Sequence, residues 1–115
     1  MLDYCVEKAR EATQEGRVRV YAAIVDSKGR LLAEASNSYT KSHPKQAEFA
    51  RRAGLGDKIF LHAEIAALVR LRTNSAAKMY IARVDVFGNP LPARPCDICQ
   101  LAIQESSIYS VEYTS

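Results

Sequence analysis

The chain contains no apolar run long enough to cross a membrane. A spanning helix needs about 18 or more consecutive apolar residues, and no stretch of the sequence reaches that length. The segment from Met1 to Lys8 also lacks the apolar centre of a signal peptide. Cysteine is scarce, with 3 in 115 residues, which argues against a disulfide scaffold and suits a reducing compartment. These absences predict a cytoplasmic protein with no membrane partner.

A strong excess of charge is missing as well. The chain has 16 Lys and Arg against 13 Asp and Glu, a formal charge of +3, which assists an anionic substrate without requiring nucleic acid. The 6 tyrosines are scattered, so the basic and aromatic stripe typical of single-strand binding is absent. No linker, repeat or low-complexity run divides the sequence, and its 48% hydrophobic content supports one modest core. We expect a single domain over residues 1–115.

Helical and strand-like patterns alternate along the chain. Apolar spacing predicts helices over residues 2–14, 62–72 and 96–105, the first ended by Gly16, and strands over residues 18–25, 30–35, 78–87 and 108–113. Turn residues at 26–29 predict that the first two strands are antiparallel. The crossover through the last helix predicts that the final two strands are parallel neighbours. The expected fold is α/β, with three α-β-α layers and a central mixed sheet of about four to five strands.

Two short motifs about thirty residues apart carry the chemistry. They are His62-x-Glu64 and Pro95-Cys96-x-x-Cys99. One imidazole and two thiolates supply three ligands for Zn²⁺ and leave the fourth tetrahedral position open to water, which is typical of a catalytic zinc. Glu64 is then the candidate proton carrier. Pro95 suits the first position of a helix, and the spacing of the cysteines places both sulfurs on one helix face.

Each of these residues also has a structural alternative. A purely structural zinc would need a fourth Cys or His, and the candidates are Cys5 and His43. Cys5 lies in the amphipathic N-terminal helix, where a small buried core residue is expected. Glu64 could be an ordinary exposed helix residue. The three ligands beside a glutamate favour the open, catalytic site over a structural one.

The motifs resemble the signature of the zinc-dependent cytidine deaminase superfamily, His-x-Glu followed by Pro-Cys-x-x-Cys. The resemblance covers most of the chain and is greatest to dCMP deaminases and tRNA adenosine deaminases; residues 39–60 match least. It implies a cytidine-deaminase-like fold, a Zn²⁺ cofactor and homo-oligomers. Members of the superfamily generally have a further strand after residues 108–113, so we expect an exposed sheet edge here. We expect either that another copy of the chain covers that edge, or that the substrate pocket is completed in a different way.

The same resemblance suggests how a substrate is held. Asn37 follows the second predicted strand, where related enzymes carry an asparagine that contacts sugar and base, although Asn37 could simply end the strand. The resemblance also implies that the backbone N–H of Ala63 points at the base carbonyl. Arg94, next to Pro95, is a candidate phosphate contact. Pro44 predicts a helical lid near the pocket.

The basic residues around that lid could hold a phosphate or only solvate a helix face; they are Lys41, Lys45, Arg51 and Arg52. The favoured hypothesis is a hydrolase that deaminates cytosine in a small nucleotide, dCMP or CMP, and releases ammonia. A nucleic-acid deaminase, acting on tRNA adenosine or single-stranded DNA cytosine, is the second hypothesis. A non-catalytic zinc-bound interaction module is the third.

Overall fold

The structure is a computed structural model that describes residues 1–12, 17–57 and 60–115. The elements, in chain order, are α1 (Leu2–Glu11), β1 (Arg19–Asp26), β2 (Leu31–Ser36), α2 (Pro44–Arg52), α3 (Ala63–Val69), β3 (Ala76–Val84), β4 (Pro90–Leu91), α4 (Asp97–Gln104) and β5 (Ser110–Tyr113). The expected α/β alternation is confirmed. The predicted helix end at Gly16 lies outside the described residues.

The strands form one mixed sheet. Its order is β2-β1-β3-β4, and β5 also pairs with β3. β1 is antiparallel to β2, as the turn between these two strands predicts. β1 is also antiparallel to β3. β5 runs parallel to β3, with Lys78 opposite Ser110 and Ile81 opposite Tyr113, which confirms the crossover argument. β5 therefore lies at the sheet edge that the sequence analysis expected.

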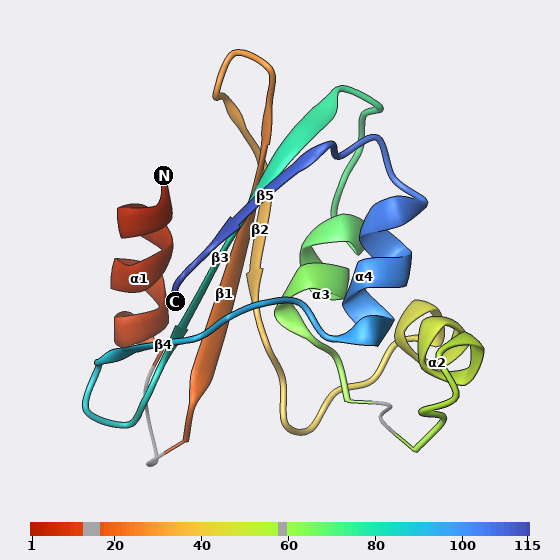
Figure 1. The fold of residues 1–115 in the computed structure, drawn as a ribbon, viewed down its shortest axis with the longest axis horizontal. Helices are drawn as coiled ribbons and strands as arrows, with labels where there is room; N and C mark the ends of the chain where they lie inside the picture. Colours follow the sequence, from red (N-terminus) through yellow and green to blue (C-terminus); the bar gives the residue numbers. More distant parts are fainter. Residues whose placement is uncertain (13–16, 58–59) are drawn as a thin grey trace.

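Helices cover both faces of this sheet, as Figure 1 shows. α1 packs on β1 and β3 from one side, whereas α3 packs on β1 and β2 from the other. α4 lies beside α3, and α2 packs outside them, mainly against α4. Within the described chain no helix combines the length and apolarity that a membrane crossing requires.

The core follows the alternation of side chains along the strands. Ile24, Met79 and Ile81 are fully buried and face α3 and α4. The opposite face buries Ala23 and Ala82 against α1, where Cys5 is also fully buried, as expected for a small core residue. Burial raises the pKa of the Cys5 thiol to about 12, so this cysteine stays protonated.

The structure corrects three expectations. The short strand β4 lies between the predicted strand over residues 78–87 and the predicted helix over residues 96–105, where no element was expected, and it pairs Pro90 and Leu91 with β3. α4 begins at Asp97, so Pro95 precedes the helix and is not its first residue. α2 does begin at Pro44, with His43 as its N-cap, but it packs on α4 and α3. None of its residues lines the cavity beside His62 and Glu64, so it is not a lid over that cavity.

Candidate metal centre

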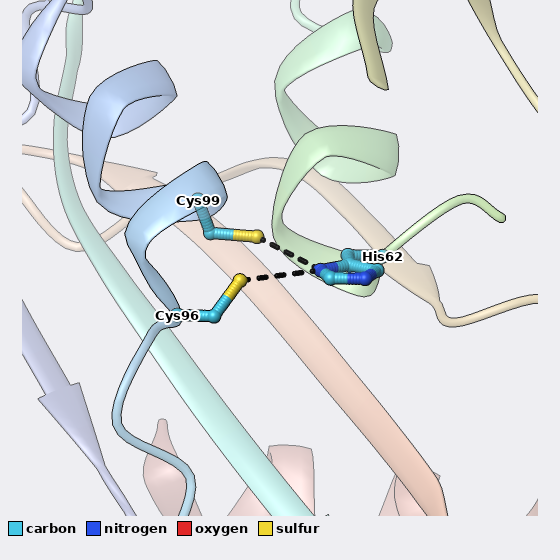
Figure 2. A group of neighbouring side chains, drawn as sticks. All are labelled: His62, Cys96 and Cys99. Atoms are coloured by element: carbon cyan, nitrogen blue, oxygen red, sulfur yellow. Dashed lines mark hydrogen bonds between the residues drawn. The ribbon is translucent and has the colours of Figure 1, made fainter. Parts of the chain in front are cut away.

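His62, Cys96 and Cys99 lie together although more than thirty residues separate the two motifs (Figure 2). His62 Nδ1 is 3.5 Å from Cys96 Sγ and 3.4 Å from Cys99 Sγ. All three potential ligand atoms lie within 4.8 Å of one another. A tetrahedral Zn²⁺ with ordinary bond lengths separates a nitrogen and a sulfur ligand by about 3.6 Å. The side chains are thus already spaced to fit one zinc ion.

Two helix starts create this arrangement. His62 is the N-cap of α3, and Cys96 is the N-cap of α4. Cys99 follows in the first turn of α4 and is fully buried. The N-terminal end of a helix carries partial positive charge, which favours thiolate over thiol. Both ends converge on one point, so the site is prepared for anionic ligands and a cation between them.

The ligand set is limited to three residues. In the part of the chain that the structure describes, His62, Cys96 and Cys99 make up the one cluster of this kind. Cys5 lies on α1 and is buried against the other face of the sheet, and His43 Nδ1 accepts a hydrogen bond from the backbone N–H of Lys45. Neither candidate for a fourth structural ligand joins the cluster, which leaves one tetrahedral position for water or substrate.

The two thiols differ in acidity. A hydrogen bond from Cys99, with a further one from His62, lowers the pKa of Cys96 to about 4 although burial acts in the opposite direction. The hydrogen bond to Cys96 and burial both raise the pKa of Cys99. The pair of thiols therefore loses its first proton readily, and the resulting negative charge lies on Cys96.

Glu64 lies in the first turn of α3, two residues after His62. It is buried, contrary to the alternative of an ordinary exposed helix residue. Burial raises the pKa of the Glu64 carboxyl, and a dication held by the neighbouring ligands would act in the opposite direction. The carboxyl thus lies inside the site, where it can form hydrogen bonds and exchange a proton.

A cavity of about 570 Å³ opens beside these residues, within the size range of small-molecule sites. Its lining is Val20, Asn37, Tyr39, His62, Ala63, Glu64, Arg83, Pro92, Ala93, Arg94 and Cys96. The structure therefore brings together all three predicted substrate contacts, Asn37, Ala63 and Arg94, with the metal and proton-carrying candidates.

Asn37 has a structural role in addition to its place in the cavity. Its side-chain Oδ1 accepts the backbone N–H of Val20 at 3.0 Å, and its own N–H donates to the Val20 carbonyl. Asn37 thus extends the pairing of β1 with β2, as the strand-end alternative expects. The Nδ2 group is a separate donor, and the residue still lines the cavity.

Two cavity residues with polar side chains, Arg83 and Tyr39, were not predicted from the sequence. Arg83 belongs to β3 and shares the sheet face of Met79 and Ile81 by alternation. An arginine on an otherwise apolar strand face was the available signal. Tyr39 lies in the poorly matched segment after β2, and two guanidinium groups stack on its ring, Arg17 at 4.9 Å and Arg19 at 5.5 Å.

The basic residues of the supposed lid do not line this cavity. Lys45 pairs with Glu48 at 3.5 Å, and Arg52 pairs with Glu105. The alternative that these cations serve the helix surface is therefore the better interpretation for Lys45 and Arg52.

The family model of the cytidine and deoxycytidylate deaminase zinc-binding region matches residues 1–115. The chain belongs to this family of zinc-binding deaminases, and its His/Cys/Cys group fits the Zn²⁺ cofactor. This confirms the resemblance drawn from the two motifs.

One solved structure of a cytidine deaminase supports the fold. A crystal structure of a mutant cytidine deaminase from Mycobacterium tuberculosis superposes with a TM-score of 0.51 at 20% identity, over 96% of this chain and 84% of that chain. A second mutant of that enzyme has a TM-score of 0.49 at 22% identity, over 93% and 80% of the two chains. A comparison with curated proteins gives no significant match.

Proposed function

We propose that this chain hydrolytically deaminates cytosine in a small nucleotide, dCMP or CMP, to give uracil and ammonia. The observation that carries the proposal is the cavity in which His62, Cys96 and Glu64 meet Asn37, Ala63 and Arg94. A zinc ion held by His62, Cys96 and Cys99 would lower the pKa of water and supply a nucleophile near neutral pH.

The remaining residues have complementary roles. Glu64 takes a proton from the attacking water and delivers it to the ring nitrogen of the base. It then takes the proton of the new C4 hydroxyl and delivers it to the departing amine, so that ammonia leaves as the C4 carbonyl of uracil forms. The N–H of Ala63, the first residue of α3, has no acceptor within the helix, so it is available to the base carbonyl. Asn37 Nδ2 contacts the sugar or base.

Arginines support a phosphate-bearing substrate. Arg83 and Arg94 line the cavity, and Arg17 and Arg19 stack on Tyr39 beside them. Within the described ranges of the chain, the ion pairs involve other residues. Among the described residues, therefore, no carboxylate pairs with these four guanidinium groups, and charge-assisted hydrogen bonds to phosphate are the strong interactions that they can form.

A nucleic-acid deaminase is the second candidate, and one observation favours it. The stack of Arg17, Tyr39 and Arg19 combines an aromatic ring with cations at the cavity, which is how single strands are held. The sequence pattern did not reveal this grouping, because Tyr39 and the arginines come from separate segments. We place the free nucleotide first because this cluster contains one aromatic ring and two cations, and because the volume of the cavity at the metal centre suits one nucleotide. A cytoplasmic location and homo-oligomers stay predictions.

The test is ammonia release from a panel of substrates by the purified protein loaded with zinc. We expect turnover of dCMP and CMP above cytidine, deoxyguanosine nucleotides and a single-stranded oligonucleotide. Turnover of the oligonucleotide alone would move the protein to the second candidate. No ammonia from any substrate, with zinc bound, would favour the non-catalytic module.

A further inference from the structure

α2 contributes a buried polar side chain to the metal centre. Gln46 is fully buried, and its Oε1 accepts the backbone N–H of His62 at 3.1 Å. Ala50, one turn later on the same face, is also fully buried. It packs in a cluster with Ile65, Ile98 and Cys99. α2 is thus held firmly against the two helices that carry the metal ligands.

A second glutamine acts at the other motif. Gln100 Nε2 donates to the Pro95 carbonyl at 2.8 Å, and the Gln100 backbone N–H donates to the Cys96 carbonyl at 2.9 Å. These two bonds fix the chain on both sides of Cys96. One glutamine therefore holds the backbone at the histidine, and the other holds it at the first cysteine.

Backbone placement matters here because of the atom that His62 presents. Nδ1 faces the sulfurs, and this nitrogen is bonded directly to Cγ, so it lies closer to the backbone than Nε2. A small displacement of the His62 backbone therefore moves Nδ1 by a similar amount, because rotation of the side chain can compensate for little of it. Nearby hydrogen bonds also connect Leu61 to Lys41 and Ser38 to Leu61, so the segment before His62 is fixed as well.

We infer that Gln46 and Gln100 are positioning residues that hold His62 and Cys96 in the geometry that binds zinc. This inference rests on the metal assignment in the proposed function and goes beyond it, because it assigns a role to α2 that neither motif contains. Residues that orient metal ligands typically contribute about 10- to 100-fold to metal affinity. We expect a loss in that range for Gln46 and a loss of about tenfold for Gln100, which is less buried.

The test compares Gln46→Met with Ala47→Gly, at an exposed position of the same helix. Methionine keeps the length of the side chain but removes the acceptor, whereas glycine weakens α2 without touching the hydrogen bond. Both should lower the melting temperature of the zinc-free protein. Only Gln46→Met should weaken zinc binding, measured by competition with a chelator. It should also change the absorption spectrum of bound Co²⁺ and reduce the rise in melting temperature that zinc produces.

Gln100→Met is the second variant, and its matched control is Gln104→Met, on the exposed face of the same helix. A zinc affinity within about twofold of wild type in Gln46→Met would overturn the inference, since ligand-orienting partners contribute at least about tenfold. If Gln46→Met does not fold, the zinc affinity of Gln100→Met is the test, and a value within about twofold of wild type would again overturn the inference. Failure of the wild-type protein to bind zinc would instead overturn the proposed function.

Discussion

Glu64 shows how one residue can be interpreted from its neighbours. Taken alone, a glutamate on a helix is expected at the surface, but its place two residues after His62 predicted a site residue. The structure buries it beside the metal ligands and in the wall of the cavity. A buried carboxyl with a raised pKa needs a function or a partner to justify its desolvation, and proton transfer in the proposed deamination would be that function.

Glu64→Gln should keep the fold and about one zinc per chain but lose deamination. Glutamine preserves the size and hydrogen bonding of the side chain and cannot exchange a proton, so the rate should fall by about 10²- to 10⁴-fold. Ammonia release at saturating dCMP and zinc content by elemental analysis are the two measurements. Retention of more than about a tenth of the wild-type rate would assign acid–base catalysis to another group.

At the scale of elements, the sequence predicted those with strong periodicity and missed those set by tertiary contacts. The strands β1, β2, β3 and β5 were found because branched and small apolar residues repeat along them. β4 has only two residues, Pro90 and Leu91, and it exists because β3 offers an open edge. No local pattern signals that. The helix at Pro44 was predicted from its proline. Its packing on α4 depends on contacts between distant parts of the chain, and the sequence analysis predicted a lid in its place.

α1 is tied to the sheet by a hydrogen-bonded cluster, in which the Tyr4 and Tyr21 hydroxyls both donate to Glu34 Oε1. Burial favours protonated Glu34, but the hydrogen bonds from Tyr21 and Tyr4 hold the pKa of this carboxyl below its ordinary value. The hydrogen bond to Glu34, together with burial, raises the pKa of Tyr4 to about 12. The cluster therefore requires an ionised glutamate and neutral tyrosines.

Tyr4→Phe should lower the free energy of unfolding by about 1 kcal/mol near pH 7. The pKa of Tyr4 is raised in the folded state, so its contribution is fully present below the unfolded value of about 10 and is lost as pH rises through about 12. Denaturant unfolding at pH 7, 9, 10.5 and 12 should show the difference from wild type shrinking over that window. Tyr109→Phe, at an exposed side chain, is the control. A difference that stays constant to pH 12 would exclude the hydrogen bond as its source.

At the scale of the whole molecule, the two motifs predicted the metal centre because their residue types are specific to it. The rest of the cavity was less accessible to sequence reasoning. Arg83 reaches the cavity only because β3 places it on the site face of the sheet, and Tyr39 belongs to the segment that least resembles the family. The overall charge of +3 also conceals how the arginines are distributed. Arg83 and Arg94 line the cavity, and Arg17 and Arg19 stack on Tyr39 in its wall.

This arrangement of arginines predicts a salt-dependent preference for the monophosphate. One or two charge-assisted hydrogen bonds of about 1.5 to 3 kcal/mol each should give dCMP a kcat/KM about tenfold or more above deoxycytidine. The preference should shrink as ionic strength rises, because exposed charges are screened. Arg83→Ala and Arg94→Ala should each reduce the preference, whereas Lys28→Ala, in the turn between β1 and β2, should not. Equal kcat/KM values for the two substrates at both ionic strengths would remove the phosphate site, because the guanidinium groups of Arg83 and Arg94 in the cavity wall would interact measurably with a bound phosphate at low salt.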